Sequence, residues 1–205
     1  MRYNELTFQG RNAVLEAFRS GKTIDKLFIL DGCQDGPIKS IVREAKKTDA
    51  IINYVDKERL DRLAGTGHHQ GVVAIGAAYE YAEVDDILAS AKEKGEDPFI
   101  FILDEIEDPH NLGAIIRTAN LAGAHGVIIP KRRAVGLTAT VAKTSAGAIN
   151  YTPVAKVTNI SQTIEELKKQ GLWFVCADMG GETMYNLNLK GPCLLYTSPS
   201  PRDTR

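Results

Sequence analysis

The chain has 205 residues, of which 43% are hydrophobic and 25% are charged, as is ordinary for a globular protein. Its 25 basic and 26 acidic residues give a formal net charge of −1. This balance excludes a global attraction to nucleic acid, so any such binding requires a local basic patch. The length allows one large domain or two small ones.

The three cysteines, Cys33, Cys176 and Cys193, are far apart and form no CxxC pair. They are interpreted as reduced thiols in a reducing compartment, with no disulfide framework and no zinc site. Residues 1–12 contain no apolar secretory segment, and no apolar run approaches the roughly 18 residues that a membrane span needs. The sequence therefore predicts a cytoplasmic protein with no membrane partner.

Residues 1–76 are expected to form a first α/β domain. The hydrophobic spacing predicts helices over 10–20, 38–46 and 57–63 and strands over 26–30, 51–55 and 70–75. Such alternation at this spacing is typical of a compact α/β sandwich. Apolar residues become sparser after residue 76, and a polar stretch containing Gly95 and Pro98 ends the region, so residues 77–97 are expected to be a linker. Within this linker, 87–92 are compatible with a helix.

The second domain is expected to start at residue 98 and to repeat a strand–helix rhythm. Strands are predicted over 99–103, 125–129, 151–157 and 172–177, with a fifth strand beginning at 191–195, and helices are predicted up to 123, over 138–146 and over 161–170. Four such units in about 80 residues predict a mostly parallel sheet with helices on both faces.

The stretch 99–120 has the strongest pattern in the chain. A continuous apolar run, typical of a buried strand, is followed by an acidic turn with Pro109 and then by apolar residues at helical spacing. Asn111 and Arg117 lie off that apolar stripe. Because sites in open α/β sheets form beyond the carboxyl ends of the strands, these two polar residues are candidates for a functional site.

The last ten residues differ in character from the rest. Residues 196–205 have no apolar periodicity, and Pro199 and Pro201 oppose regular structure. One interpretation is a natural disordered tail. The other, which we adopt, is that 195–205 are foreign sequence that interrupts the fifth strand.

The run 108–119 resembles the first motif of the SpoU (TrmH-like) RNA ribose 2′-O-methyltransferases of the SPOUT superfamily. Residues 12–14 (Asn-Ala-Val) and 69–72 (His-Gln-Gly-Val) resemble the family's N-terminal substrate-binding domain, which is similar to ribosomal protein L30e. Lys131-Arg132-Arg133 and the run 145–148 (Ser-Ala-Gly-Ala) also match. The subgroup most similar to the sequence methylates a guanosine ribose in 23S ribosomal RNA.

This resemblance, over about residues 7–194, implies an L30e-like α/β/α sandwich followed by a mostly parallel α/β SPOUT methyltransferase domain. It also implies S-adenosylmethionine as cofactor, ribosomal RNA as partner and a homodimer. The family has two further motifs after the position of residue 194, which form most of the cofactor pocket and thread a trefoil knot. The sequence has neither, so the chain is expected to be C-terminally truncated, without the knot segment, and its activity and dimerisation are in doubt.

Arg117 is expected to be the key residue of the site. The family is proposed to use the matching arginine as a general base, but arginine holds its proton firmly. A planar guanidinium instead suits paired hydrogen bonds to phosphate, so Arg117 is expected to hold the RNA phosphate and to assist attack by the 2′-hydroxyl. The alternative is a solvated helix arginine paired with a nearby acid.

Asn111 is expected to orient Arg117 or the ribose, or else to cap the helix, a role for which Asp108 with Pro109 competes. The acidic turn contains Glu105, Glu107 and Asp108 and is interpreted as a solvated turn. The alternative is a metal site, but the sequence offers no matching cluster of ligands. No metal is expected.

The remaining candidates follow from the resemblance and from local composition. The expected cofactor-binding residues are Ala177, Asp178, Met179 and Gly180, although an ordinary glycine-rich loop is an equal alternative. The expected RNA-binding residues are Arg11, Asn12, His69, Gln70, Lys131, Arg132 and Arg133. His69 is a candidate for stacking on a base of looped RNA, whereas His110 and His125 are expected to be structural.

Two other functions compete with an RNA 2′-O-methyltransferase. One is a non-catalytic RNA-binding module, a function that remains open to a chain without most of the cofactor pocket. The other is an unrelated nucleotide-binding α/β protein, but the sequence contains neither a GxGxxG after a first strand nor a P-loop.

Overall fold

The computed structural model describes residues 6–48, 50–65, 68–177 and 181–197. The chain divides into two compact units, here called the N-terminal unit (residues 1–80 with 136–139) and the C-terminal unit (residues 81–135 with 140–205). Within the described ranges, every helix is too short or too polar to span a lipid bilayer.

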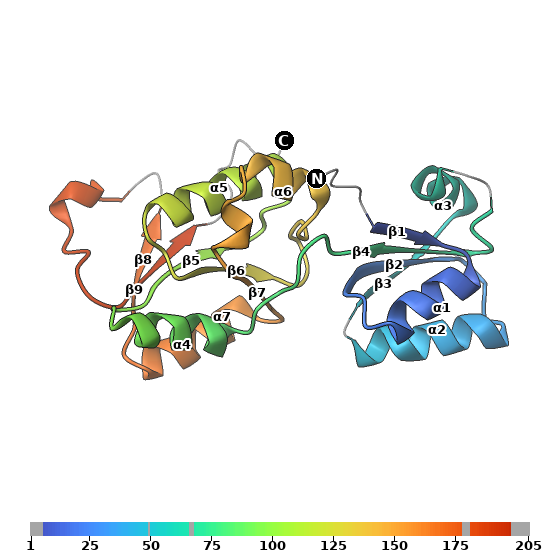
Figure 1. Cartoon of the computed structure of the whole chain (residues 1–205), viewed down its shortest axis with the longest axis horizontal. Coiled ribbons are helices and arrows are strands. Elements are labelled where there is room, and N and C mark those ends of the chain that lie inside the picture. Colours follow the sequence, from blue (N-terminus) through green and yellow to red (C-terminus); the bar gives the residue numbers. More distant parts are fainter. Residues whose placement is uncertain (1–5, 49, 66–67, 178–180, 198–205) are drawn as a thin grey trace. The chain divides into compact units, whose positions relative to one another are not determined.

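The N-terminal unit is an α/β/α sandwich. Its strands are β1 (Leu6–Gln9), β2 (Ile24–Leu30), β3 (Ile51–Val55) and β4 (Val72–Gly76), in the order β1-β4-β2-β3. β2 and β3 are parallel, whereas β4 is antiparallel to both β1 and β2. Helices α1 (Arg11–Arg19) and α2 (Gly36–Lys47) cover one face, and α3 (Lys57–Ala64) covers the other (Figure 1).

The helices of this unit form because caps and apolar spacing agree. In α2, Ile38, Ile41 and Ala45 are buried, and the Asp35 carboxylate accepts a hydrogen bond from the backbone N–H of Ile38 at 3.2 Å. Sequence periodicity missed β1, because it has only four residues and its first two are exposed at the sheet edge.

The C-terminal unit contains an all-parallel sheet. Its strands are β5 (Phe99–Leu103), β6 (Gly126–Pro130), β7 (Val154–Val157), β8 (Trp173–Ala177) and β9 (Cys193–Thr197), in the order β7-β6-β5-β9-β8. Helices α4 (Val84–Lys94) and α7 (Ile160–Lys169) cover one face, and α5 (Pro109–Leu121) and α6 (Ala139–Thr144) cover the other (Figure 1). Short 3₁₀ turns η1 (Ala148–Asn150) and η2 (Met184–Asn186) follow α6 and β8.

The expected linker 77–97 is wrong over most of its length. Ala82 forms a bridge with Ala155 beside β7, and α4 buries Ile87 and Ala91 completely. Ile87 belongs to the hydrophobic core that also contains Ile100 of β5. The polar residues that suggested a linker lie on the exposed side of an amphipathic helix, so residues 81–97 are part of the C-terminal unit.

The expected end of the fifth strand at Leu195 is also wrong. β9 continues through Tyr196 and Thr197 and pairs with β5 along the whole length of that strand, Phe99 to Leu103. It also pairs with β8 on its other side. β9 is therefore an interior strand, and the expected foreign segment 195–205 begins inside it.

Candidate functional site

Helix α5 begins at the carboxyl end of β5 with a capped first turn. The Asp108 carboxylate accepts a hydrogen bond from the backbone N–H of His110 at 3.0 Å, and Pro109 occupies the first helical position. Asp108 therefore performs the capping role for which Asn111 was a candidate. The exposed side chain of Asn111 is left available for another partner.

Arg117 lies further along α5 and is also exposed. It is the one Asp, Glu, Lys or Arg residue of that helix, and no acidic residue stands three or four positions away on either side. Among the described residues, its guanidinium makes no hydrogen bond or ion pair, in contrast to the paired, solvated arginine considered as an alternative. Helix geometry separates Asn111 and Arg117 by about 9 Å along the axis and by roughly 120° around it.

The outward face of α5 is held in place by a close contact on its inner side. A Cβ atom at Gly113 would lie 2.8 Å from Thr144 Cβ and 2.9 Å from the Ser145 backbone nitrogen. The Thr144 hydroxyl donates to the carbonyl of Thr140 at 2.9 Å, and Ser145 is fully buried. The motif residue Ser145 thus belongs to the packing that positions α5.

The loops after β5 and β6 are joined to each other. Arg133 Nη1 donates to Glu105 Oε1 at 2.7 Å, and the Val135 N–H donates to the Ile106 carbonyl at 2.8 Å. Glu105 and Arg133 both adopt left-handed backbone conformations, with φ of 54° and 58°. Because both loops leave the carboxyl edge of the sheet, the acidic turn and the basic turn 131–133 form one charged rim. Arg132 is exposed on it.

Of the predicted cofactor residues, Ala177 is the last residue of β8, at the same edge of the sheet. Ala177 is exposed and pairs with Thr197 of β9. Asp178, Met179 and Gly180 lie outside the described residues. The strand order changes direction around β5, where β6 lies on one side and β9 on the other, and such a position is where parallel sheets bind ligands.

A second candidate region lies in the N-terminal unit. Three predicted RNA-binding residues, Arg11, Asn12 and Gln70, line one surface hollow of about 660 Å³. Gly71, from the run 69–72, lines it as well, together with Leu30, Cys33 and Pro37, which no sequence motif indicated. The hollow forms where the start of α1 meets the loop that precedes β4.

Arg11 holds this hollow together. Its Nε donates to the Gln70 carbonyl at 3.2 Å, its backbone N–H donates to Gln70 Oε1 at 3.1 Å, and its Nη2 donates to Asp35. Arg11 is thus occupied by bonds within the protein. Asn12 beside it is exposed and makes no side-chain hydrogen bond within the described ranges.

The expectation that His69 stacks on RNA is corrected by its burial. Only 5% of His69 is exposed, its Nδ1 accepts the Gly71 N–H at 3.0 Å, and its Nε2 lies 2.9 Å from Asp61 Oδ1. Since Nδ1 accepts a hydrogen bond, Nε2 carries the ring proton and donates a hydrogen bond to Asp61. His69 therefore positions Gln70, whose backbone φ of 50° needs such support.

His125 of the C-terminal unit is fixed in the same way. It is 4% exposed, its Nδ1 accepts the Phe99 N–H at 3.1 Å, and its Nε2 lies 3.1 Å from Glu96 Oε2. These bonds give it a structural role at the start of β5. No group of three or more His, Cys, Asp or Glu side chains arranged to hold a metal ion occurs in the part of the chain that the structure describes.

Two family models match the chain. Residues 98–196 match the SpoU rRNA Methylase family, and residues 9–82 match the RNA 2′-O ribose methyltransferase substrate binding family.

Named relatives agree with these matches. A protein of Bacillus subtilis (strain 168) assigned by name to the TrmH family of tRNA/rRNA methyltransferases, YacO, is 54% identical over 169 residues, which are 82% of this chain and 68% of that protein. A protein of Staphylococcus haemolyticus with the same family name is 48% identical over 181 residues, 88% of this chain and 72% of its own length.

Among solved structures, the fold resembles that of the SpoU methyltransferase AviRb from Streptomyces viridochromogenes, crystallised in complex with the cofactor AdoMet. The TM-score is 0.52 and the sequence identity is 19%, over 95% of this chain and 73% of that one. At this identity, the similarity establishes the fold alone.

Proposed function

Since the chain belongs to the SpoU (TrmH-like) family of RNA methyltransferases, we propose that it methylates the 2′-hydroxyl of a guanosine ribose in 23S ribosomal RNA. The observation that carries the proposal is Arg117, an exposed guanidinium without a partner among the described residues, in the helix that follows the central strand β5. The family descriptions support RNA and the ribose 2′-oxygen as the target. The choice of 23S RNA and of guanosine follows from the sequence resemblance.

Arg117 acts in this proposal by holding the RNA phosphate next to the reacting ribose. Two parallel N–H donors grip a phosphate in a fixed orientation, and alignment of the hydroxyl with the methyl group can lower the barrier by several kcal/mol. A protonated guanidinium cannot take the hydroxyl proton. It stabilises the oxygen instead, as negative charge develops on it, and the hydroxyl proton leaves to solvent water. Asn111, exposed in the first turn of α5, orients the ribose from the carboxyl edge of the sheet.

S-adenosylmethionine is the cofactor in this proposal and supplies the methyl group when bound. Ala177 is placed to contact the cofactor, because it is exposed at the carboxyl edge of the sheet beside the interior strand β9. Asp178, Met179 and Gly180 are proposed to complete its part of the site. A binding isotherm of S-adenosylmethionine with the 205-residue chain tests these assignments directly.

The RNA is proposed to contact both units. On the charged rim, Arg132 is exposed, and the exposed Arg133–Glu105 ion pair is of a kind that contributes at most about 1 kcal/mol, so a phosphate can displace the carboxylate. Lys131 belongs to the same turn. In the N-terminal unit, the Asn12 amide reads a base edge while Arg11 and Gln70 shape the hollow. Acting on ribosomal RNA, the protein would work in the cytoplasm. A homodimer is what the resemblance implies for the family, whereas the sequence puts dimerisation of this chain in doubt.

Arg117→Lys tests the proposal, because lysine keeps the charge but loses the paired geometry. Losing one hydrogen bond to a charged group costs about 1.5–3 kcal/mol, so transfer of tritiated methyl groups to 23S RNA should fall roughly tenfold to hundredfold. Arg62→Lys, at an exposed arginine of α3, is the matched control and should keep the wild-type rate. A near-normal rate for Arg117→Lys would refute the paired phosphate contact.

The methyl-transfer assay, together with a measurement of RNA binding, separates a methyltransferase from a non-catalytic RNA-binding module. If the wild-type chain binds 23S RNA but transfers no methyl group at saturating S-adenosylmethionine, it is a non-catalytic RNA-binding module. Transfer to a tRNA transcript in preference to 23S RNA would contradict the proposed substrate while leaving the methyl-transfer chemistry intact.

A further inference from the structure

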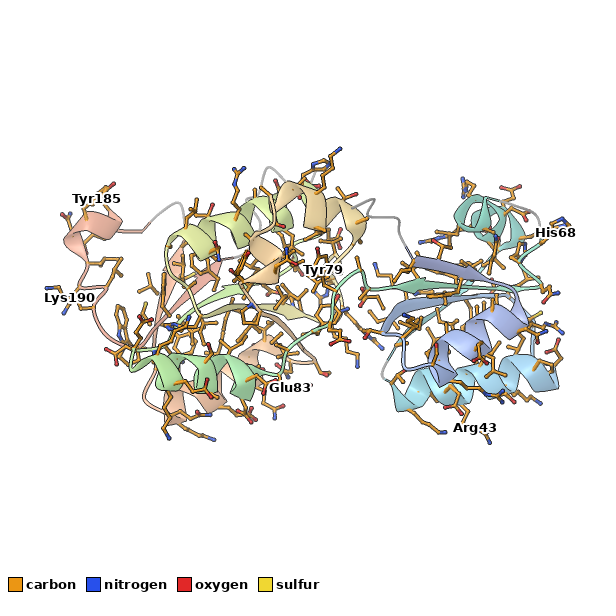
Figure 2. All side chains as sticks on the ribbon, in the orientation of Figure 1. Arg43, His68, Tyr79, Glu83, Tyr185 and Lys190 are labelled. Carbon is orange, nitrogen blue, oxygen red and sulfur yellow. The ribbon has the colours of Figure 1, made fainter. Side chains whose placement is uncertain are left out.

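Helix α2 carries a row of cationic side chains that are not among the candidate site residues described above. We define the α2 basic flank as Lys39, Arg43, Lys46 and Lys47, which are all exposed. Together with Val42 they line one surface hollow of about 400 Å³. In Figure 2, Arg43 extends from α2 on the side turned away from the sheet.

The cations of this flank are evenly spaced. Helix geometry places Lys39, Arg43 and Lys46 within a sector of roughly 60° around α2, separated by about 6 Å and 4.5 Å along the axis. Each therefore lies about one helical turn from the next, on the same side of the helix. Long, flexible cationic side chains at this spacing can each reach a different phosphate of one RNA strand.

The charge of this flank is not balanced locally. Along α2, four cations accompany a single acid, Glu44, which lies 3.0 Å from Lys47 Nζ and 3.9 Å from Arg43 Nε. Helix α7, by contrast, carries two cations and two acids, with Glu165 paired to Lys168 at 2.8 Å. Because the whole chain has a net charge of −1, α2 is the kind of local patch that nucleic-acid binding requires here.

An exposed aromatic side chain lies on the same face of the sheet. β3 is an edge strand in contact with α2, and its Tyr54 is 56% exposed. Tyr54 is in register with Ile29, and Ile52, two residues before it, is in register with Leu27. Leu27 and Ile29 belong to the core under α1 and α2, and Ile52 packs against that core. The alternation of side chains along a strand therefore puts Tyr54 on the α2 side.

We propose that the α2 basic flank and Tyr54 bind a single-stranded or looped segment of RNA, with phosphates on the cations and a base stacked on the tyrosine ring. Cations and an exposed aromatic ring on one face of a sheet are the combination that suits a single strand, because every base has a face that can stack. This inference rests on RNA as the substrate of the proposed function and adds the surface and the conformation of RNA that the N-terminal unit recognises.

The test measures binding of a fluorescein-labelled oligouridylate to the full chain by fluorescence anisotropy, without cofactor, between about 50 and 200 mM salt. In Lys39→Gln/Arg43→Gln/Lys46→Gln, the negative slope of log K (K being the association constant) against log salt should become shallower by about 2, since each of three lost phosphate contacts with a single strand contributes about 0.7. The control Lys92→Gln/Lys94→Gln/Lys169→Gln removes equal charge from α4 and α7 and should keep the wild-type slope.

Two substitutions test stacking separately. Tyr54→Ala should weaken binding roughly tenfold to hundredfold without changing the salt slope, because base stacking on an aromatic ring is lost. Tyr54→Phe keeps the ring and should bind like the wild type. All positions are exposed, and circular dichroism establishes that each variant is folded.

An unchanged slope in the α2 variant, or an equal loss in the control, would overturn the proposal. Tight binding of duplex RNA that Tyr54→Ala does not weaken would overturn the single-stranded part. A failure of the proposed function alone gives a different result, in which the wild-type chain binds RNA through this surface but transfers no methyl group.

Discussion

Two residues, His69 and Gly113, position the two candidate surfaces through their contacts within the protein. Neither is placed to touch RNA. Buried His69 joins Asp61 of α3 to the Gly71 backbone and so supports the strained conformation of Gln70. Gly113 lets α5 approach Thr144 closely enough that its inner side has no room for a methyl group. In both cases the residue's value lies in positioning its neighbours.

Gly113→Ala should therefore destabilise the C-terminal unit. Alanine improves helix propensity by about 1 kcal/mol, but overpacking against backbone and Thr144 costs about 1–3 kcal/mol. The added Cβ would lie 2.9 Å from the Ser145 nitrogen, which cannot move as a flexible side chain would. Urea unfolding followed by circular dichroism measures the change, and we expect a lower midpoint and a reduced methyl-transfer rate.

Gly36→Ala is the control, because an added Cβ at this helical glycine of α2 would meet no atom within 4 Å apart from its chain neighbours and its own helix backbone. It should lower the midpoint less than Gly113→Ala does, since the only crowding of the new Cβ comes from the following Pro37. A stabilising Gly113→Ala would show that α5 and α6 pack less closely than described.

At the scale of the element, β9 determines the architecture of the C-terminal sheet. It runs between β5 and β8 and pairs with both over five residues. Its first residue, Cys193, is 4% exposed, and burial raises the pKa of the Cys193 thiol above its ordinary value of 9.0. The exposed Cys176 of β8 provides an internal comparison.

Cys193 should resist iodoacetamide in the folded chain, whereas Cys176 should react, because the thiolate is the reactive form and access is required. Peptide mass spectrometry after labelling at mildly alkaline pH measures both. The raised pKa also means that the folded chain holds this proton more tightly than the unfolded chain. Its contribution to stability is complete below the unfolded thiol pKa and is lost as the pH rises through the raised value. Equal labelling of the two cysteines would contradict an interior β9.

At the scale of the whole molecule, the described residues form separate hydrophobic cores in the two units. Ile41 is fully buried in the core of the N-terminal unit, under α1 and α2. Ile102 is fully buried in the core of the C-terminal unit, between the sheet and α4 with α7. Neither core cluster includes residues of the other unit.

Truncation of one core should therefore weaken one unit. Ile41→Ala removes buried methyl groups at a cost of about 2–5 kcal/mol, and hydrogen exchange read by mass spectrometry should show faster exchange within residues 6–76. Ile102→Ala is the reciprocal variant and should act within residues 81–197. Uniform loss of protection by either variant would mean that the two units unfold as one.

The sequence alone determined the class of the fold and most of its elements. Apolar runs and helical spacing are local signals, so the strand 99–103, the helix after it and an α/β sandwich in the first unit could be predicted from residue order. The α/β/α layering of that unit was implied by the family resemblance. The motif around Asn111 and Arg117 also indicated the family, which the relatives and family models confirm. The roles of Asn111 and Arg117 stay predictions.

Only the tertiary structure decided which polar residues are free to act. His69 is buried beside α3, and the guanidinium of Arg11 is engaged by Asp35. The position of α4 depends on a core built from strands that are distant in the sequence. The interior position of β9 and the side on which Tyr54 emerges depend on strand pairing across the sheet. These are long-range contacts, and residue order alone cannot specify them because hydrophobic periodicity reports which side of an element is buried, not what buries it.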